Sequence, residues 1–104
     1  APNPVILAGP ITIDLARHVV TRDGEEVKLT ATEFKLVAYL AGHADRVLTH
    51  QAILNNVWGS ADIDHTEYLR VYIGQLRKKL EANPDQPHYL LTEPGVGYRL
   101  LTDV

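Results

Sequence analysis

The first quarter of the chain follows a pattern of strands. Residues 5–15 read VILAGPITIDL, and apolar and polar side chains alternate in the second half of this stretch. A repeat of two residues is typical of a half-buried strand, and the Gly-Pro pair at 9–10 breaks it as a turn does. The Asp-Gly pair at 23–24 separates two further strand-like runs and favours a tight hairpin, because that turn requires positive φ. Residues 5–29 therefore predict a small antiparallel sheet.

The apolar spacing becomes helical after Thr30. Thr30 and Glu33 fit a capping box, in which each side chain satisfies an unpaired N–H at the start of a helix. Apolar residues then recur at mostly helical intervals to about Gly42. A second helix is predicted to begin near Thr49, which is suited to be its N-cap, and to end at Gly59.

A third and longer helix is predicted over 65–82, after the acidic loop SADID and before Pro84. When this segment is wound at about 100° per residue, its apolar side chains fall on one stripe. The stripe consists of Leu69, Tyr72, Ile73, Leu76 and Leu80. The segment 88–101, HYLLTEPGVGYRLL, then predicts two short strands around a glycine-rich turn.

This order of elements predicts an α+β fold of the winged helix-turn-helix type: an N-terminal antiparallel sheet, a three-helix core and a C-terminal hairpin wing. In such a fold the second helix supports the third, the third enters a groove of DNA, and the hairpin lies along the flanking backbone. Two prolines in residues 1–4 indicate the remnant of a linker, so the domain is expected to occupy 5–104.

Composition narrows the function classes only a little. The 104 residues form one domain, and the formal net charge of −3 gives no hint of a nucleic-acid partner. The chain has no cysteine, which excludes disulfides and thiolate metal sites and agrees with a cytoplasmic location. Its five histidines show no metal-ligand spacing, and Ser60 is its only serine, so neither catalysis nor a cofactor is expected.

The distribution of charge is more informative than the total. Residues 1–65 carry five basic and eight acidic side chains, whereas the rest of the chain carries five of each. Four of the basic residues in this second part lie on the third predicted helix. They are Arg70, Arg77, Lys78 and Lys79.

The side of this helix opposite the apolar stripe allows two interpretations. It collects Glu67, Arg70, Val71, Gly74, Gln75 and Lys78. As a recognition helix, Arg and Gln would donate to base edges, Glu would accept from a cytosine amino group and Val would touch a thymine methyl. As a solvated face, its basic last turns would simply be favoured by the helix dipole, which is the commoner situation. Gly74 costs roughly 1 kcal/mol of helix propensity, but it would let DNA approach closely.

Four stretches together resemble the DNA-binding output domain of response regulators of the OmpR/PhoB type. They are LTATEFKLVAYL, VLTHQAILNNVWG, YLRVYIGQLRKKLE and LLTEPGVGYRL, and the resemblance runs from about residue 5 to 101. LRKKLE followed by GVGYRL is the most specific combination. HTEYLRVYIGQLRKKLE further resembles the branch of the family that regulates high-affinity potassium uptake.

The resemblance implies a four-stranded N-terminal sheet, helix 65–82 in the major groove and hairpin 88–101 over the adjacent minor groove. A receiver domain, phosphorylated by a histidine kinase, would normally precede Ala1. Loop 59–64 corresponds to the segment that such proteins use to touch RNA polymerase. Binding is typically to direct-repeat double-stranded DNA as a head-to-tail dimer.

The resemblance also assigns residues by position. The base-reading candidates are Arg70, Val71, Gly74 and Gln75, and the backbone-contact candidates are Trp58, Tyr72, Arg77, Thr92 and Tyr98. Two backbone candidates come from the sequence itself: Thr49, because helix N-termini attract phosphate, and Lys78, because of its charge. Gly74 and Gln75 stand where the family often has basic residues, and Pro94 stands where it often has a wing arginine. These departures predict that binding depends less on salt concentration than it does in arginine-rich members of the family.

Several alternatives remain open at this level. Residues 62–65, DIDH, could hold a metal, although a solvated acidic loop that caps the third helix is the simpler interpretation. Trp58 could be a core residue, a DNA contact or both, and Arg99 could meet a phosphate or form a salt bridge. The net charge also leaves room for a winged-helix protein-interaction module that does not bind DNA.

Overall fold

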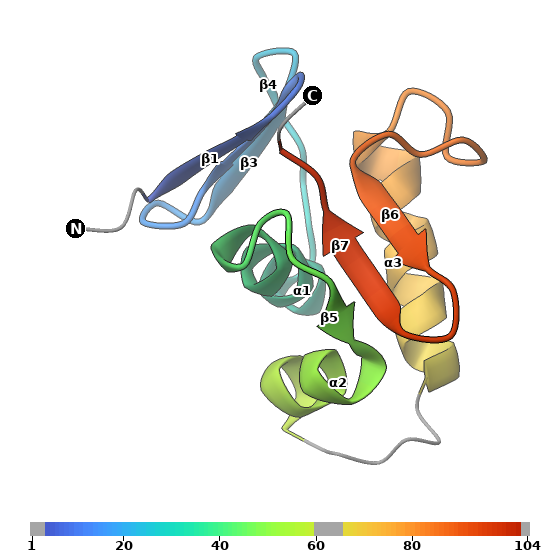
Figure 1. Cartoon of the computed structure of the whole chain (residues 1–104). Helices are drawn as coiled ribbons and strands as arrows, with labels where there is room; N and C mark the ends of the chain where they lie inside the picture. The colour runs from blue at the N-terminus through green and yellow to red at the C-terminus, as the bar shows by residue number, and fades with distance from the viewer. Residues whose placement is uncertain (1–3, 60–65, 103–104) are drawn as a thin grey trace.

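The computed structural model describes residues 4–59 and 66–102. The chain opens with a four-stranded antiparallel sheet of order β1-β2-β3-β4 (Figure 1). Its strands are β1 (Val5–Ala8), β2 (Ile11–Asp14), β3 (Val19–Arg22) and β4 (Glu25–Glu26). Gly9 and Gly24 have φ of 57° and 84°, so both expected turns use positive φ. The sheet predicted from the alternating pattern is confirmed.

Helix α1 (Ala31–Gly42) begins with the predicted capping box. The Glu33 backbone N–H donates to Thr30 Oγ1 at 3.2 Å, and the Thr30 N–H donates to Glu33 Oε1 at 2.8 Å. Both backbone N–H groups would otherwise be unpaired at the start of the helix. The capping box therefore fixes where α1 begins.

Helix α2 (His50–Trp58) also begins and ends as predicted. Thr49 Oγ1 accepts from the Ala52 N–H at 3.1 Å, and Gly59 closes the helix with φ of 70°. The sequence pattern did not predict β5 (Leu48–Thr49), a two-residue strand directly before the helix.

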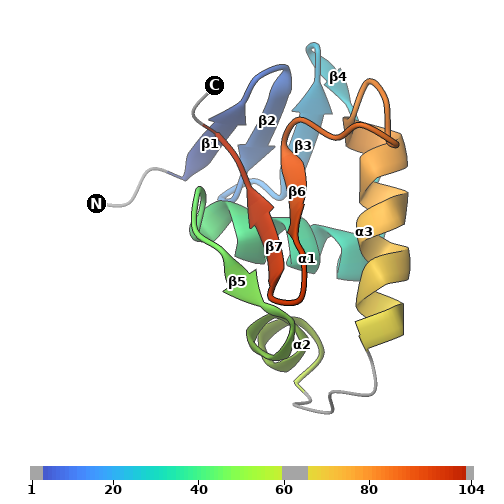
Figure 2. The ribbon, with the colours of Figure 1, turned by 45° about the vertical axis from the view of Figure 1, so that its right-hand side comes forward.

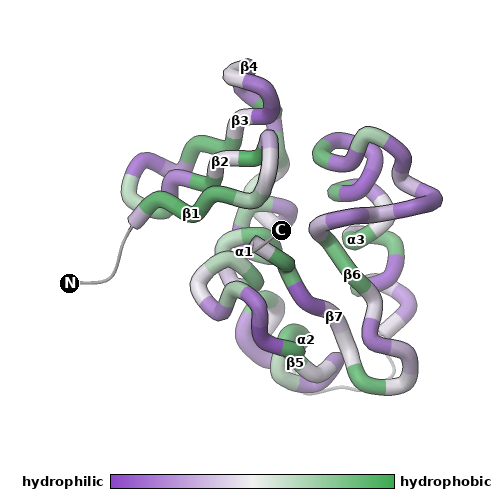
Figure 3. The backbone as a smooth tube through the Cα atoms, turned by 45° about the horizontal axis from the view of Figure 1, so that its top comes forward, coloured by the Kyte–Doolittle hydropathy of each residue, from purple (hydrophilic) through white to green (hydrophobic). Residues whose placement is uncertain are grey.

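Helix α3 (Thr66–Leu80) is shorter at its end than the predicted range 65–82, and residue 65 lies outside the described residues. Directly after the helix, the side chain of Glu81 accepts from the backbone N–H groups of the segment that follows the turn. Leu69, Ile73 and Leu76 of the predicted stripe are buried. The colours along α3 in Figure 3 accordingly mix hydrophobic and hydrophilic positions.

The C-terminal hairpin consists of β6 (Leu90–Glu93) and β7 (Gly97–Leu100). Strand β7 also pairs with β5, which gives a three-stranded sheet of order β5-β7-β6. A Cβ at position 97 would collide with the Leu48 carbonyl, so only glycine allows these two strands to approach so closely.

The two sheets lie on different sides of α1, and the hairpin runs beside α3 (Figures 1 and 2). Aliphatic side chains from both sheets and all three helices form one core, among them Ile11, Ile13, Leu36, Leu40, Ile53, Leu54, Leu69, Leu76 and Leu100. This core leaves one face of α3 and the β6–β7 turn exposed. The fold is the predicted winged helix-turn-helix.

Candidate nucleic-acid interface

The residues predicted to read bases lie on the exposed face of α3. Arg70, Val71 and Gln75 are exposed, and Lys78 lies on the same exposed side of the helix. Apart from the backbone of its own helix, a Cβ added at Gly74 would meet no atom within 4 Å, so the space above this glycine is open. The structure therefore brings all four predicted base readers and Lys78 onto one accessible surface.

This surface also carries an acidic residue. Glu67 Oε1 lies 3.9 Å from Arg70 Nη1, and both side chains are more than three-quarters exposed, at 77% and 76%. Ion pairs this exposed contribute little to stability. The Arg70 guanidinium can therefore exchange this partner for another hydrogen-bond acceptor at little cost.

Trp58 and Tyr72 lie together where α2 meets α3. Their ring centroids are 5.3 Å apart with an interplanar angle of 60°, and both side chains are partly buried. Trp58 is thus both a core residue and partly accessible, as an amphipathic indole permits. Two of the predicted backbone contacts therefore form one aromatic pair beside the exposed face of α3.

Arg77 and Thr92 are also brought together, at the junction of α3 and the wing. Arg77 Nη2 donates to Thr92 Oγ1 at 2.7 Å. Arg77 Nε and Nη2 also both donate to the Leu90 carbonyl, at 3.0 Å and 2.8 Å. The Thr92 hydroxyl accepts one bond here and keeps its own proton for a further acceptor.

Thr49 and Tyr98 lie at the other side of the wing. Thr49 is exposed, although its hydroxyl already caps α2. Tyr98 is 6% exposed, and its ring packs edge-on against His50 with centroids 5.6 Å apart. The His50 N–H donates to the Val96 carbonyl at 3.1 Å, which ties the wing turn to the start of α2. Tyr98 is therefore mainly a packing residue with a small accessible part.

Lys79 differs from the other basic residues of α3. Its Nζ donates to Glu33 Oε1 at 2.7 Å and to the Lys28 carbonyl at 3.1 Å, so it joins the end of α3 to the start of α1. Burial alone would raise the pKa of Glu33, but the hydrogen bond from Lys79, the bonds from Thr30 and the Lys79 charge outweigh it. The pKa of Glu33 is therefore held below its ordinary value of 4.5.

The structure shows the salt bridge that was one of the two alternatives for Arg99. Its Nη2 lies 2.9 Å from Glu93 Oε1 on the neighbouring wing strand, so it forms a salt bridge within the hairpin. An opposite-charge pair across two neighbouring strands stabilises the hairpin.

Sequence reasoning missed Glu81, which is 2% exposed and accepts from three backbone N–H groups. A carboxylate directly after the last apolar residue of the stripe was the only signal. Its partners lie seven to nine residues further along the chain, across a turn, so the helical pattern could not reveal them.

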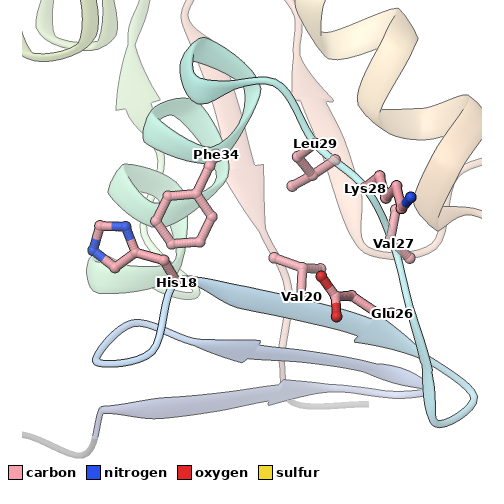
Figure 4. Close-up of a pocket in the computed structure, with 7 residues that line it drawn as sticks. All are labelled: His18, Val20, Glu26, Val27, Lys28, Leu29 and Phe34. Carbon is pink, nitrogen blue, oxygen red and sulfur yellow. The ribbon is translucent and has the colours of Figure 1, made fainter.

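A hollow of about 320 Å³ lies elsewhere, between the N-terminal sheet and α1 (Figure 4). His18 stacks on Phe34 at its edge, with ring centroids 4.7 Å apart. The lining residues are His18, Val20, Glu26, Val27, Lys28, Leu29 and Phe34. Glu26 and Lys28, which carry opposite charges, both line this hollow.

The predicted metal alternative at 62–65 and most of loop 59–64 lie outside the described residues. Within residues 4–59 and 66–102, no group of three or more histidine and acidic side chains is arranged to hold a metal ion. No helix in the described part of the chain is long and apolar enough to cross a membrane.

Comparison with known sequences gives a consistent result. The family described as "Transcriptional regulatory protein, C terminal" matches residues 24–100. The KDP operon transcriptional regulatory protein KdpE of Escherichia coli (strain K12) is 46% identical over 101 residues, which are 97% of this chain and 45% of that protein. KdpE of Mycobacterium tuberculosis (strain ATCC 25618 / H37Rv) is 47% identical over 97 residues, 93% of this chain and 43% of that protein. The chain thus spans less than half the length of these relatives.

Solved structures with the same fold include domains bound to DNA. The RstA DNA-binding domain of Klebsiella pneumoniae, in complex with the RstA box, matches with a TM-score of 0.86 and 31% identity over 97% of this chain and 100% of that one. The DNA-binding domain of the response regulator AdeR, in complex with an intercistronic region, matches with a TM-score of 0.74 and 30% identity over 97% and 100% of the two chains.

Proposed function

Because this chain belongs to the transcriptional regulatory protein C-terminal family, in its OmpR/PhoB type and on the KdpE branch, we propose that its α3 and hairpin read a specific double-stranded DNA site. It is the DNA-binding domain of a response regulator, with a role in regulating transcription.

One observation carries the proposal. The exposed face of α3 presents Arg70, Val71, Gly74 and Gln75 side by side, with no described atom covering Gly74. Arginine and glutamine donate to base edges, and valine fits a thymine methyl, so this surface combines three kinds of base recognition in one helix. A helix of 15 residues fits the major groove, where such contacts are made.

The backbone contacts are proposed to surround this helix. The Trp58–Tyr72 pair lies on one side, and the Arg77–Thr92 pair lies toward the wing. Thr49, Lys78 and the accessible part of Tyr98 extend the same surface. Phosphate contacts fix the position of the protein on DNA, and base contacts select the sequence.

Fluorescence anisotropy of the domain, titrated onto a duplex selected from random DNA and onto a scrambled duplex, tests the proposal. The selected duplex is expected to bind at least about a thousandfold more tightly at physiological salt. Equal and weak binding to both duplexes would overturn it and would favour a protein-interaction module instead.

The finer assignments follow from the same family. We propose that the domain binds direct repeats as a head-to-tail dimer and that loop 59–64 touches RNA polymerase. We further propose that the complete protein is cytoplasmic, carries a receiver domain phosphorylated by a histidine kinase, and regulates potassium uptake. The family is a regulatory DNA-binding family rather than a class of enzymes, and we propose no catalytic activity for this chain.

A further inference from the structure

Strand β6 forms one edge of its sheet, and side chains of the α3 segment bind its backbone there. The Leu90 N–H donates to Glu81 Oε2 at 2.8 Å. The Leu90 carbonyl accepts from Arg77 Nε and Nη2 at 3.0 Å and 2.8 Å. Both polar groups of this one residue are therefore bound by side chains that are four positions apart along the chain.

Glu81 binds more of the same segment. Its Oε1 accepts from the His88 N–H at 2.8 Å, and its Oε2 also accepts from the Tyr89 N–H at 3.0 Å. The Glu81 side chain is 2% exposed and its bond from Leu90 is buried, so water cannot easily replace it as the acceptor of that bond. Leaving the buried Leu90 N–H unpaired would be costly, so this carboxylate fixes where the wing begins.

Arg77 forms a further hydrogen bond along β6. Through Thr92 Oγ1 it binds a second residue of the strand, two positions after Leu90. We call Arg77 and Glu81 together the edge clamp. The edge clamp takes the place of the missing strand on the outer side of β6 and joins that strand directly to the helix that presents the base-reading residues.

We propose that the edge clamp positions the wing for DNA recognition, by holding β6 at a fixed place relative to α3 before DNA binds. The inference rests on the proposed function and assigns Glu81 a role that no DNA contact would explain. A wing held in place is ordered when the protein folds, so DNA binding does not have to order it. The spacing between the major-groove helix and the wing is then set by the protein.

Site-directed cleavage of DNA measures where the wing lies. Because the chain has no cysteine, Val96→Cys places a single thiol on the wing turn, at a side chain that is 47% exposed. An iron–EDTA group attached to this thiol cuts the nucleotides near the turn. With the otherwise unchanged domain on its selected duplex, we expect a narrow group of cuts at one flank of the site.

Glu81→Gln is the main test variant, because it keeps the size of the side chain but offers only one acceptor oxygen to three N–H groups. We expect its cuts to spread over neighbouring nucleotides and its affinity for the selected duplex to fall about tenfold. Arg77→Lys, which keeps the charge but loses the paired donors to Leu90, is expected to spread the cuts in the same way. It serves in place of Glu81→Gln if that variant does not fold.

Glu33→Gln is the matched control. Glu33 is equally buried and hydrogen-bonded, but it binds the start of α1 and Lys79, away from the wing. It should lower stability and leave the cuts narrow. A folded Glu81→Gln or Arg77→Lys domain with cuts as narrow as this control would overturn the role of the edge clamp. If the domain with Arg77 and Glu81 unchanged cuts the duplex at no preferred position, the proposed function is wrong, and the inference is wrong with it.

Discussion

At the scale of single residues, the four basic side chains of α3 occupy four different environments. Arg77 is bound to the wing, and Lys79 is paired with Glu33. Arg70 lies beside an exposed carboxylate, while Lys78 is exposed. A basic helix in the sequence is therefore not a uniformly basic surface in the fold, and each residue should respond differently to substitution.

Arg70→Ala and Arg77→Ala are expected to separate base reading from positioning. Arg70→Ala should cost roughly 1–3 kcal/mol of binding free energy to the selected duplex and relax the sequence preference. Arg77→Ala should weaken binding to all sequences, because it removes both the proposed phosphate contact and the hydrogen bonds from Arg77 to Leu90 and Thr92 of the wing. Anisotropy on a panel of single-base variants of the site checks this, and identical profiles for the two variants would refute the division of roles.

Gly74→Ala tests the reason for a glycine in the middle of α3. Because nothing lies within 4 Å of the added Cβ, the substitution should stabilise the domain by roughly 1 kcal/mol through helix propensity. If DNA approaches the helix closely here, affinity for the selected duplex should fall at the same time. Urea denaturation and anisotropy measure the two effects. A variant that is more stable and binds as well as before would show that the glycine is not needed for contact with DNA.

At the scale of elements, local chemistry made the helices predictable. Thr30, Glu33, Thr49 and Gly59 are capping residues whose partners lie within four positions, so the sequence identifies them directly. Strand β5 was missed because its partner is β7, almost fifty residues away, and only the fit of Gly97 against Leu48 allows the pairing. The equally short β4 was predictable because the Asp-Gly turn at 23–24 places it beside β3, whereas β5 has no such turn to its partner.

The ion pair between Glu33 and Lys79 makes the junction of α1 and α3 sensitive to acid. The folded-state pKa of Glu33 lies below its ordinary value of 4.5, so ionised Glu33 stabilises the fold above about that pH. This contribution is lost as the pH falls through the lower, folded-state pKa.

Glu33→Gln should therefore lower the free energy of unfolding by about 1.5–3 kcal/mol at neutral pH, since it removes a charged hydrogen-bond acceptor. The difference from the unchanged domain should shrink as the pH falls below the ordinary pKa of 4.5. Urea denaturation at a series of pH values measures this difference. A gap of constant size down to strongly acidic pH would mean that the ionised pair contributes no stability.

At the scale of the whole molecule, the net charge of −3 and the engaged basic residues limit how many phosphates the domain can neutralise. Binding should therefore depend only moderately on salt. We expect the logarithm of the affinity to fall with the logarithm of salt concentration with a slope of about −2 to −4. Anisotropy across a salt series gives this slope, and a value steeper than about −6 would require phosphate contacts that this surface does not offer.

The fold could be predicted almost completely from the sequence, whereas the interface could be predicted only as a set of positions. Helical periodicity placed Arg70 and Gln75 on the exposed side of α3, as found. Periodicity could not indicate that Arg77 and Lys79 are held by distant partners, or that Glu81 binds the start of the wing. Such contacts join segments that only the folded chain brings together.

The most direct test of the account is an NMR titration of the domain with its selected duplex, following the backbone amide signals. We predict that the largest chemical-shift changes fall on 67–78 in α3 and on 92–98 in the wing, while 5–26 in the N-terminal sheet remain nearly unchanged. Changes centred on the N-terminal sheet, or the same changes with a scrambled duplex, would contradict sequence-specific binding through α3 and the wing.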